Sequence, residues 1–288
     1  MKKIAIFGYG NVGKAAEEAV RAAEDMELAG VYHRNELDRL IAEALGKIDV
    51  VLLCTPTREV PRCAKQLLAA GIPTVDSFDI HTRIGSVRRE LMEVARQGGA
   101  VSILSAGWDP GSDSVVRCLM EAIAPKGLTY TNFGPGRSMG HTVAAKSKAG
   151  VADALSMTIP LGTGIHRRMV YVQLQPGADF AEVEKAILAD DYFAHDETHV
   201  IQVPDVSALN NVAHGVNLVR NGVSGTTHNQ RLEFNMTIDN PALTGQVMAA
   251  CARAALRLKQ EKRFGCYTMI ELAPIYLMAS EEYALSLV

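Results

Sequence analysis

A glycine-rich turn behind an apolar run constrains the fold of this chain more than any other feature of its sequence. The run Lys3–Phe7 leads into Gly8-Tyr9-Gly10-Asn11-Val12-Gly13, a G-x-G-x-x-G pattern at the head of a helix-patterned segment. Glycines at this spacing permit a tight turn, and the free N–H groups of the helix start favour a pyrophosphate. The pattern therefore predicts a dinucleotide site at Gly8, Tyr9, Gly10, Asn11, Val12 and Gly13; the alternative is an ordinary strand-to-helix turn.

Short β-rich runs alternate with helix-patterned runs through the N-terminal part of the chain. The expected strands are Lys3–Phe7, Leu28–Tyr32, Val50–Cys54, Thr74–Asp76 and Val101–Leu104. The expected helices are Val12–Ala23, Leu37–Leu45, Val60–Ala70 and Ser86–Gln97. This alternation is typical of an α/β fold and predicts a Rossmann-type domain with a parallel sheet covered on both faces.

The pattern changes from about Leu128 onward. Met169–Leu174, His199–Val203 and Arg231–Ile238 alternate apolar and polar residues, as half-buried antiparallel strands do. We therefore expect a second α+β domain with an open, mostly antiparallel sheet. Asp179 is placed to cap one helix within it.

A last long helix begins at Asn240-Pro241, with Asn as cap and Pro at the first helical position, and is expected to return to the first domain. The expected organisation is a dinucleotide-binding domain at residues 1–118, completed by 240–288. Residues 119–239 are expected to bind substrate and to mediate dimerisation.

Composition excludes several classes of function. With 288 residues, of which 48% are hydrophobic, the chain is long enough for two packed domains. A net charge of -3 gives no basic stripe for nucleic acid, and no segment approaches the roughly 20 apolar residues of a membrane helix. The five cysteines and eight histidines show no metal-ligand spacing, so we expect no metal, no disulfide and a cytoplasmic location.

The residues that follow the second expected strand are His33-Arg34-Asn35. An NAD site normally offers a carboxylate to the ribose hydroxyls at this place, whereas here a cation stands instead. Arg34 can pair with a 2′-phosphate, and His33 and Asn35 can donate further hydrogen bonds, so NADP is favoured. The alternative is a solvated surface arginine.

Three further strands end at the edge where open α/β sheets hold their ligands. Cys54-Thr55-Pro56-Thr57 follows one of them and is expected to line the nicotinamide ribose, with a plain turn as the alternative. The polar clusters Asp76–His81 and Ala106–Gly111 follow the other two. Asp79 and Asp109 can bind a substrate ammonium group or relay protons, although both residue types also cap helices and form turns.

These segments also carry a family resemblance. Asp76–His81, Gly107–Gly111, Phe133–Gly136, Met139–His141, Ser156–Thr158, Ala213–Gly215 and the ending Gly265–Glu271 resemble, in this order, the motifs of meso-diaminopimelate dehydrogenases. The similarity covers nearly the whole chain. It is closest to the shorter form of the family, which lacks a long insertion before the strand of Arg168.

The resemblance implies reversible oxidation of the D-centre of meso-2,6-diaminopimelate by NADP, giving L-2-amino-6-oxopimelate and ammonia in lysine and diaminopimelate biosynthesis. It places Asp79 and Asp109 at the reacting centre as the catalytic residues. It further assigns substrate contacts to Trp108, Phe133, Met139, Gly140, Thr158, Arg168, His214 and Asn240, and cofactor contacts to Ser77, Phe78 and Pro110.

Each implied contact has a structural alternative. Arg168 stands in an Arg167-Arg168 pair that is more usual on a surface, and His214 is flanked like a loop histidine. Asn240 already serves as a helix cap, and His141 is equally an acid–base group or a core histidine.

Phe133 stands where members of the family can carry Trp, which adds a hydrogen-bond donor that Phe lacks. That difference leaves the substrate breadth open. Three other hypotheses stand beside the main one. The first, which the shorter family form makes plausible, is a related NADP enzyme acting on other D-amino acids or 2-oxo acids. The second is a non-catalytic NADP sensor on the same fold, against which the charged set of Asp79, Asp109, Arg168 and His214 argues. The third, a dihydrodipicolinate-type reductase, is disfavoured because no His-His pair with a following Lys occurs in the second domain. A small-molecule amino acid substrate and at least a homodimer are expected.

Overall fold

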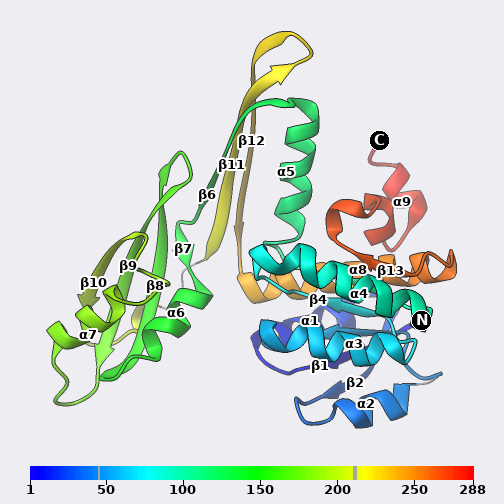
Figure 1. Cartoon of the computed structure of the whole chain (residues 1–288), viewed down its shortest axis with the longest axis horizontal. Helices are drawn as coiled ribbons and strands as arrows, with labels where there is room; N and C mark the ends of the chain where they lie inside the picture. Colours follow the sequence, from blue (N-terminus) through cyan, green and yellow to red (C-terminus); the bar gives the residue numbers. More distant parts are fainter. Residues whose placement is uncertain (45, 210–212) are drawn as a thin grey trace. The chain divides into compact units, whose positions relative to one another are not determined.

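The computed structural model of the chain describes residues 1–44, 46–209 and 213–288. These residues form two compact units (Figure 1). Unit 1 comprises Met1–Cys118 and Asn240–Val288, and unit 2 comprises Leu119–Asp239. Helix α5 (Ser112–Ile123) begins in unit 1 and ends in unit 2.

Unit 1 is built on a six-stranded sheet in the order β13-β5-β4-β3-β1-β2, and each neighbouring pair is parallel. Its strands are β1 (Lys2–Phe7), β2 (Met26–Tyr32), β3 (Val50–Leu53), β4 (Thr74–Asp76), β5 (Val101–Ile103) and β13 (Gly265–Tyr267). The strand order reverses beside β1, and parallel strands require crossover connections, which the helices of this unit supply.

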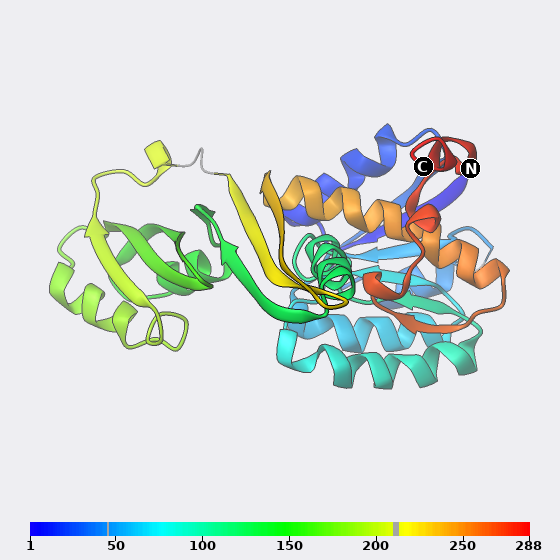
Figure 2. The ribbon, with the colours of Figure 1, turned by 90° about the horizontal axis from the view of Figure 1, so that it is seen from above.

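Helices cover both faces of this sheet. They are α1 (Asn11–Ala22), α2 (Leu37–Ala44), α3 (Val60–Ala69), α4 (Ile84–Gly98) and α8 (Asn240–Gln260). Ile4 and Ile6 of β1 pack in one buried cluster with α1 and α8, whereas Ala5 and Phe7 pack in a second cluster with α2, α3 and α4. Figure 2 shows the sheet between these two helical layers. Successive side chains of β1 thus point to opposite faces of the sheet, and both faces are buried, as is typical of a parallel sheet.

The Rossmann-type prediction is confirmed, and the element ends lie within two residues of the expected ones. The expected helix Leu37–Leu45 corresponds to α2, but Leu45 itself lies outside the described residues. The last long helix belongs to unit 1, and its Met248 and Ala252 are fully buried in the cluster that covers one face of the sheet.

The described residues of unit 2 form two sheets where the sequence predicted one. The first has the order β10-β9-β8-β7 and the second the order β12-β11-β6. Their strands are β6 (Lys126–Phe133), β7 (Gly136–Arg137), β8 (Val151–Gly162), β9 (Ile165–Leu174), β10 (Glu197–Gln202), β11 (His214–Ser224) and β12 (Thr227–Ile238). The expected mostly antiparallel α+β character is confirmed.

One strand departs from that expectation. The segment His199–Val203 was expected to be antiparallel, but β10 pairs with β9 in parallel, with His199 opposite Met169. The reason is helix α7 (Phe180–Leu188), which connects β9 to β10 and forms the crossover that a parallel pair needs. The expected cap is present, since Asp179 Oδ1 accepts the N–H of Ala181 at 2.7 Å.

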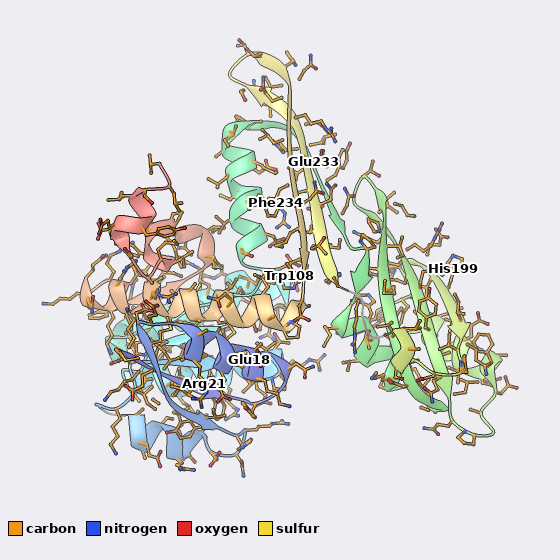
Figure 3. The ribbon with its side chains drawn as sticks, turned by 180° about the vertical axis from the view of Figure 1, so that it is seen from behind. Glu18, Arg21, Trp108, His199, Glu233 and Phe234 are labelled. Carbon is orange, nitrogen blue, oxygen red and sulfur yellow. The ribbon has the colours of Figure 1, made fainter. Side chains whose placement is uncertain are left out.

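Two helices cover one face of the four-stranded sheet. Ala145 of α6 (Met139–Lys146) and Ile187 of α7 lie in one buried cluster with Val170 and Val172 of β9. The three-stranded sheet is more open: Glu233 of β12 is exposed while its neighbour Phe234 is half-buried on the opposite face (Figure 3). This alternation matches the expected half-buried strand Arg231–Ile238.

Short elements complete the described chain. They are the 3-10 turns η1 (Thr57–Glu59), η2 (His81–Arg83), η3 (Ser207–Leu209), η4 (Met269–Glu271) and η5 (Pro274–Leu277), and helix α9 (Glu281–Leu285). None of the helices in the described residues has the length and apolar character required to cross a membrane.

Candidate functional site

The glycine-rich turn of unit 1 leaves one side open for a ligand. Gly8 has φ +98°, and a Cβ there would lie 2.5 Å from the Cys54 carbonyl oxygen. A Cβ on Gly13 would lie 2.2 Å from the Gly8 carbonyl oxygen, so strand and helix approach closely only without side chains. A Cβ on Gly10 would meet nothing within 4 Å. Gly10 precedes α1 without a side-chain cap, which leaves the helix N–H groups available to an anion.

The other residues of this turn surround that opening. Tyr9 is exposed, donates its hydroxyl to Glu17 Oε2 at 2.6 Å and meets the His33 ring edge-on at 6.3 Å. Asn11 is exposed at the start of α1, and Val12 packs against the α1–α8 face of the core. The contact between Tyr9 and His33 brings the turn and the end of β2 together.

The end of β2 presents a cation to solvent. The Arg34 side chain is 72% exposed, and its Nη2 lies 3.8 Å from Glu59 Oε1. The nearest carboxylate in sequence, Glu36, is already engaged, because it accepts the His33 N–H at 2.7 Å and pairs with Arg39. Asn35 is exposed beside them. The arrangement therefore fits an anion better than a pair of hydroxyl groups.

Two loops meet at the ends of β3 and β4. Thr57 Oγ1 accepts the backbone N–H of Asp79 at 3.2 Å. Thr55 Oγ1 is buried without a hydrogen-bond partner among the described residues, and Pro56 is exposed. Burial raises the pKa of the Cys54 thiol to about 12. The thiol therefore stays protonated, and Cys54 contributes packing surface rather than a nucleophile.

The segment after β4 is tied to the core by Asp76, a residue for which no individual role was predicted. Asp76 is fully buried, and its Oδ1 accepts the N–H groups of Phe78 at 3.0 Å and Ser105 at 3.1 Å. Burial raises the pKa of Asp76 to about 7. The Phe78 side chain is fully buried in the core, so only its backbone can serve the expected cofactor contact, whereas Ser77 is half-buried.

The loop between β5 and α5 is fastened to the first turn of that helix. Ser112 N–H donates to Gly107 O at 3.1 Å, and Asp113 N–H donates to Trp108 O at 3.0 Å. Trp108, labelled in Figure 3, is 5% exposed, and Pro110 is buried. The loop thereby fixes the direction of Asp109, which lies at its centre.

Asp109 lies in a cluster of charged groups. Its Oδ1 is buried and has no hydrogen-bond partner among the described residues, and its Oδ2 lies 3.8 Å from His81 Nε2. Burial and the negative charge of Asp113 raise the pKa of Asp109 to about 8, with a smaller contribution from Asp79. The structure thus brings together the two aspartates that the sequence singled out, and it adds Asp113, which the sequence did not.

A second cluster lies in unit 2 around Arg168. Thr158 and Arg168 are opposite one another on β8 and β9, and Arg168 Nη1 donates to Thr158 Oγ1. Arg168 Nε donates to Asp196 Oδ2 at 2.6 Å, and its side chain is only 13% exposed. Arg167 instead pairs with Glu197, because neighbouring residues of a strand point to opposite faces. The exposed basic pair is therefore the wrong interpretation for Arg168.

Two histidines near Arg168 are kept neutral. Burial and the positive charge of Arg168 lower the pKa of His214 and of His141 to about 4 each. His141 Nδ1 lies 2.8 Å from Ser138 Oγ, and its ring meets the rings of Tyr192 and Phe193 edge-on. His141 is accordingly a packed, hydrogen-bonded residue, and the sequence could not separate this state from an acid–base role.

The remaining expected substrate residues occupy different elements. Met139 and Gly140 begin α6, whose preceding Ser138 makes no side-chain cap bond to the helix. Phe133 ends β6, and its N–H donates to His166 Nε2 at 2.8 Å. Asn240 is the first residue of α8 and belongs to unit 1. Within the described part of the chain, no three His, Cys, Asp or Glu side chains gather in a way that could hold a metal ion.

Comparisons with known proteins agree with one another. Residues 107–165 match the family described as the diaminopimelic acid dehydrogenase C-terminal domain. The meso-diaminopimelate D-dehydrogenase of Bacteroides fragilis is 58% identical, covering 98% of this chain and 97% of that protein. The solved structure of the C. glutamicum DAP dehydrogenase in complex with DAP is 28% identical, with a TM-score of 0.88 over 99% of this chain and 98% of that one.

A further similar structure is that of an engineered D-amino acid dehydrogenase bound to NADP+. It is 27% identical, with a TM-score of 0.83 over 99% of this chain and 98% of that one.

Proposed function

Because this chain belongs to the meso-diaminopimelate D-dehydrogenase family, we propose that it uses NADP to oxidise the D-centre of meso-2,6-diaminopimelate, reversibly, to L-2-amino-6-oxopimelate and ammonia. The chain is an oxidoreductase of the amino acid dehydrogenase class that acts on a small molecule. The 58% identity to the Bacteroides fragilis enzyme over nearly the whole chain is the observation that carries the proposal. The assignment to lysine and diaminopimelate biosynthesis is part of it.

The proposed cofactor site lies at the carboxyl edge of the parallel sheet. The open side of Gly10 and the uncapped start of α1 fit a pyrophosphate, and the exposed Arg34 fits a 2′-phosphate. When bound, NADP supplies the hydride acceptor. The residues proposed to hold it are Gly8, Tyr9, Gly10, Asn11, Val12, Gly13, His33, Arg34, Asn35, Cys54, Thr55, Pro56, Thr57, Ser77, Phe78 and Pro110.

The proposed substrate contacts divide by charge. Asp79 and Asp109 bind the ammonium group at the reacting centre, where Asp109 offers a buried oxygen without a partner among the described residues. Arg168, supported by Thr158 and beside the neutral His214, binds a carboxylate. Trp108 and Phe133 supply apolar walls, the backbone at Met139 and Gly140 supplies donors, and Asn240 binds the distal end of the substrate.

The reaction requires a proton to leave the substrate nitrogen. An ammonium group has no lone pair, so hydride loss from the neighbouring carbon needs the amine form. Asp79 and Asp109 hold this nitrogen, and Asp109 is the candidate proton acceptor because its pKa is raised to about 8. Water then adds to the imine carbon and ammonia departs.

The roles of the two units and the assembly are proposed with the function. Unit 1 is the dinucleotide-binding domain, and unit 2 binds substrate and mediates a homodimer or higher homo-oligomer in the cytoplasm. The open face of the three-stranded sheet, with exposed Arg231, Glu233 and Asn235, is the surface we expect to meet a second copy. A sedimentation mass equal to one chain would contradict the dimer.

The decisive experiment follows NADPH formation at alkaline pH with meso-, L,L- and D,D-diaminopimelate, each with NADP and with NAD. We expect strong turnover of the meso isomer with NADP. Equal turnover with NAD would contradict the role of Arg34, and no turnover of the meso isomer would contradict the proposed substrate.

A broader D-amino acid dehydrogenase is the second candidate. Phe133 favours it, because Phe lacks the donor that Trp would offer to a specific substrate. D-Alanine and D-lysine distinguish the two candidates: turnover of either at a rate close to that of meso-diaminopimelate would favour the broader enzyme.

A further inference from the structure

Asp113 is a buried acidic side chain that none of the roles above uses. It stands in the first turn of α5 and is 0% exposed. Its Oδ2 accepts a hydrogen bond from Arg117 Nη2 at 2.6 Å, and its Oδ1 accepts one from Ser114 Oγ at 3.2 Å. A carboxylate away from water is unfavourable unless it is paired, so this ion pair explains how Asp113 can be buried but not why an acid is there.

Asp113 lies beside the loop that carries Asp109, because its backbone N–H donates to the carbonyl oxygen of Trp108, the residue before Asp109, at 3.0 Å. After burial, the charge of Asp113 and a hydrogen bond with it are the largest effects that raise the pKa of Asp109 to about 8. The other charged or titratable groups that face Asp109 are Arg117 on the same helix, which acts in the opposite direction, and Asp79 and His81 from the segment after β4. Asp109 Oδ1 meanwhile has no partner among the described residues.

We propose that Asp113 and Arg117 are positioning residues that set the charge of Asp109: Asp113 keeps a proton on Asp109 in the substrate-free enzyme, Arg117 limits this effect, and a bound ammonium group displaces the proton to solvent. The inference rests on the proposed function, since it takes the substrate amine as the cation that Asp109 meets.

The physical basis is the repulsion between two neighbouring carboxylates in a dry environment. Such a pair holds one proton over a wide pH range, because ionising both members brings two negative charges together. An arriving cation relieves the repulsion, so the O–H bond of Asp109 breaks, the proton passes to solvent and the ammonium takes its place. No electrons are transferred in this step.

The chain contains a built-in reporter for this titration. Trp108 is its one tryptophan, and it precedes Asp109 directly. Indole fluorescence responds to the charge of an adjacent group. Excitation at the long-wavelength edge of the indole absorption band avoids tyrosine emission. The fluorescence of the substrate-free protein, titrated from acid to alkaline pH, therefore follows Asp109 without any need for turnover, and loss of the transition in Asp109→Asn assigns it.

Opposite shifts distinguish a charge-setting role from a merely structural one. We expect the transition near pH 8 in the unchanged protein. Asp113→Asn should move its midpoint down by at least about one pH unit, and Arg117→Gln should move it up, whereas Arg117→Lys should leave it nearly in place. The acid limb of kcat/KM for amine oxidation should move in the same directions.

Three results would overturn the inference: no transition between about pH 6 and 9.5 in the unchanged protein, the same midpoint in all variants, or shifts of equal sign in Asp113→Asn and Arg117→Gln. Failure of the proposed function is distinct from these, because it appears as absent turnover of diaminopimelate while the fluorescence transition and its opposite shifts persist.

Discussion

At the scale of single residues, the candidate site depends on which charges are already satisfied within the chain. Arg168 is held by Asp196 and Thr158 and is directed by the pairing of β8 with β9, whereas Arg34 is exposed and only loosely associated with Glu59. A preorganised cation binds a carboxylate with little loss of side-chain entropy, and an exposed cation gains more from a doubly charged phosphate. We therefore expect substitution of Arg168 to affect the substrate and substitution of Arg34 to affect the cofactor.

Arg168→Met should lower kcat/KM for meso-diaminopimelate by roughly 100-fold, because it removes a charge-assisted contact to carboxylate. Steady-state kinetics with Arg167→Met as control tests this, since Arg167 is adjacent in sequence but pairs with Glu197. Equal losses in the two variants would show that the effect is general and not specific to the site.

Arg34→Ser should raise the KM for NADP by roughly 10- to 100-fold and leave the KM for NAD nearly unchanged, because only NADP carries the 2′-phosphate. The exposed Arg96 of α4 provides the control Arg96→Ser. If NAD and NADP were affected alike, Arg34 would not contact the phosphate.

At the scale of elements, one helix decides the direction of a strand. Because α7 connects β9 to β10, the two strands run parallel, and Thr198 of β10 lies opposite Arg168. This register brings Asp196, two residues earlier than Thr198, to the Arg168 guanidinium. The helix between the strands thus positions a partner of Arg168.

Asp179→Ala should destabilise unit 2 by about 1 kcal/mol, because it removes the cap that accepts the N–H of Ala181 at the start of α7. Thermal unfolding should show a decrease of a few degrees in the apparent midpoint. Asp191→Ala, which changes an exposed aspartate beyond the same helix, should have no such effect; a similar decrease there would contradict the capping role.

At the scale of the whole molecule, the C-terminal segment completes a unit that the N-terminal segment begins. Arg253 of α8 is 7% exposed and binds both oxygens of Asp25, at 2.9 and 2.7 Å, in the turn before β2. Hydrogen bonds from Arg253 and Lys2 hold the pKa of Asp25 well below its usual range. Folding therefore favours the ionised form of this residue.

Arg253→Met should destabilise the protein by about 2 kcal/mol at pH 7, because Asp25 loses its main partner. A depressed pKa gives stability that is present above the unfolded value, about 4, and is lost as the pH falls through the folded value. The difference from the unchanged protein should thus diminish below about pH 4, as measured by denaturant unfolding. A difference independent of pH would mean that Arg253 acts through packing alone; Arg263→Met, at an exposed position, serves as control.

The sequence by itself determined the features that depend on near neighbours in the chain. The Gly8–Gly13 turn, the period of the strands and the Asp179 cap are local, so their residue types predict them directly. The candidate acids Asp79 and Asp109 were found because they follow strands that end at one edge of the sheet. The roles of Arg168 and His214 came from the family resemblance, since neither residue is distinctive alone.

Only the tertiary structure decided which charges meet. It pairs Asp25 with Arg253, 228 residues away, and Arg168 with Asp196, and it buries His214 beside that arginine. It also placed β10 parallel to β9, and it brought the carboxylate of Asp113 to Asp109 through a loop whose bonds the sequence does not specify. Electrostatics and strand direction depend on distances in space and on burial, and neither can be read from the order of residues.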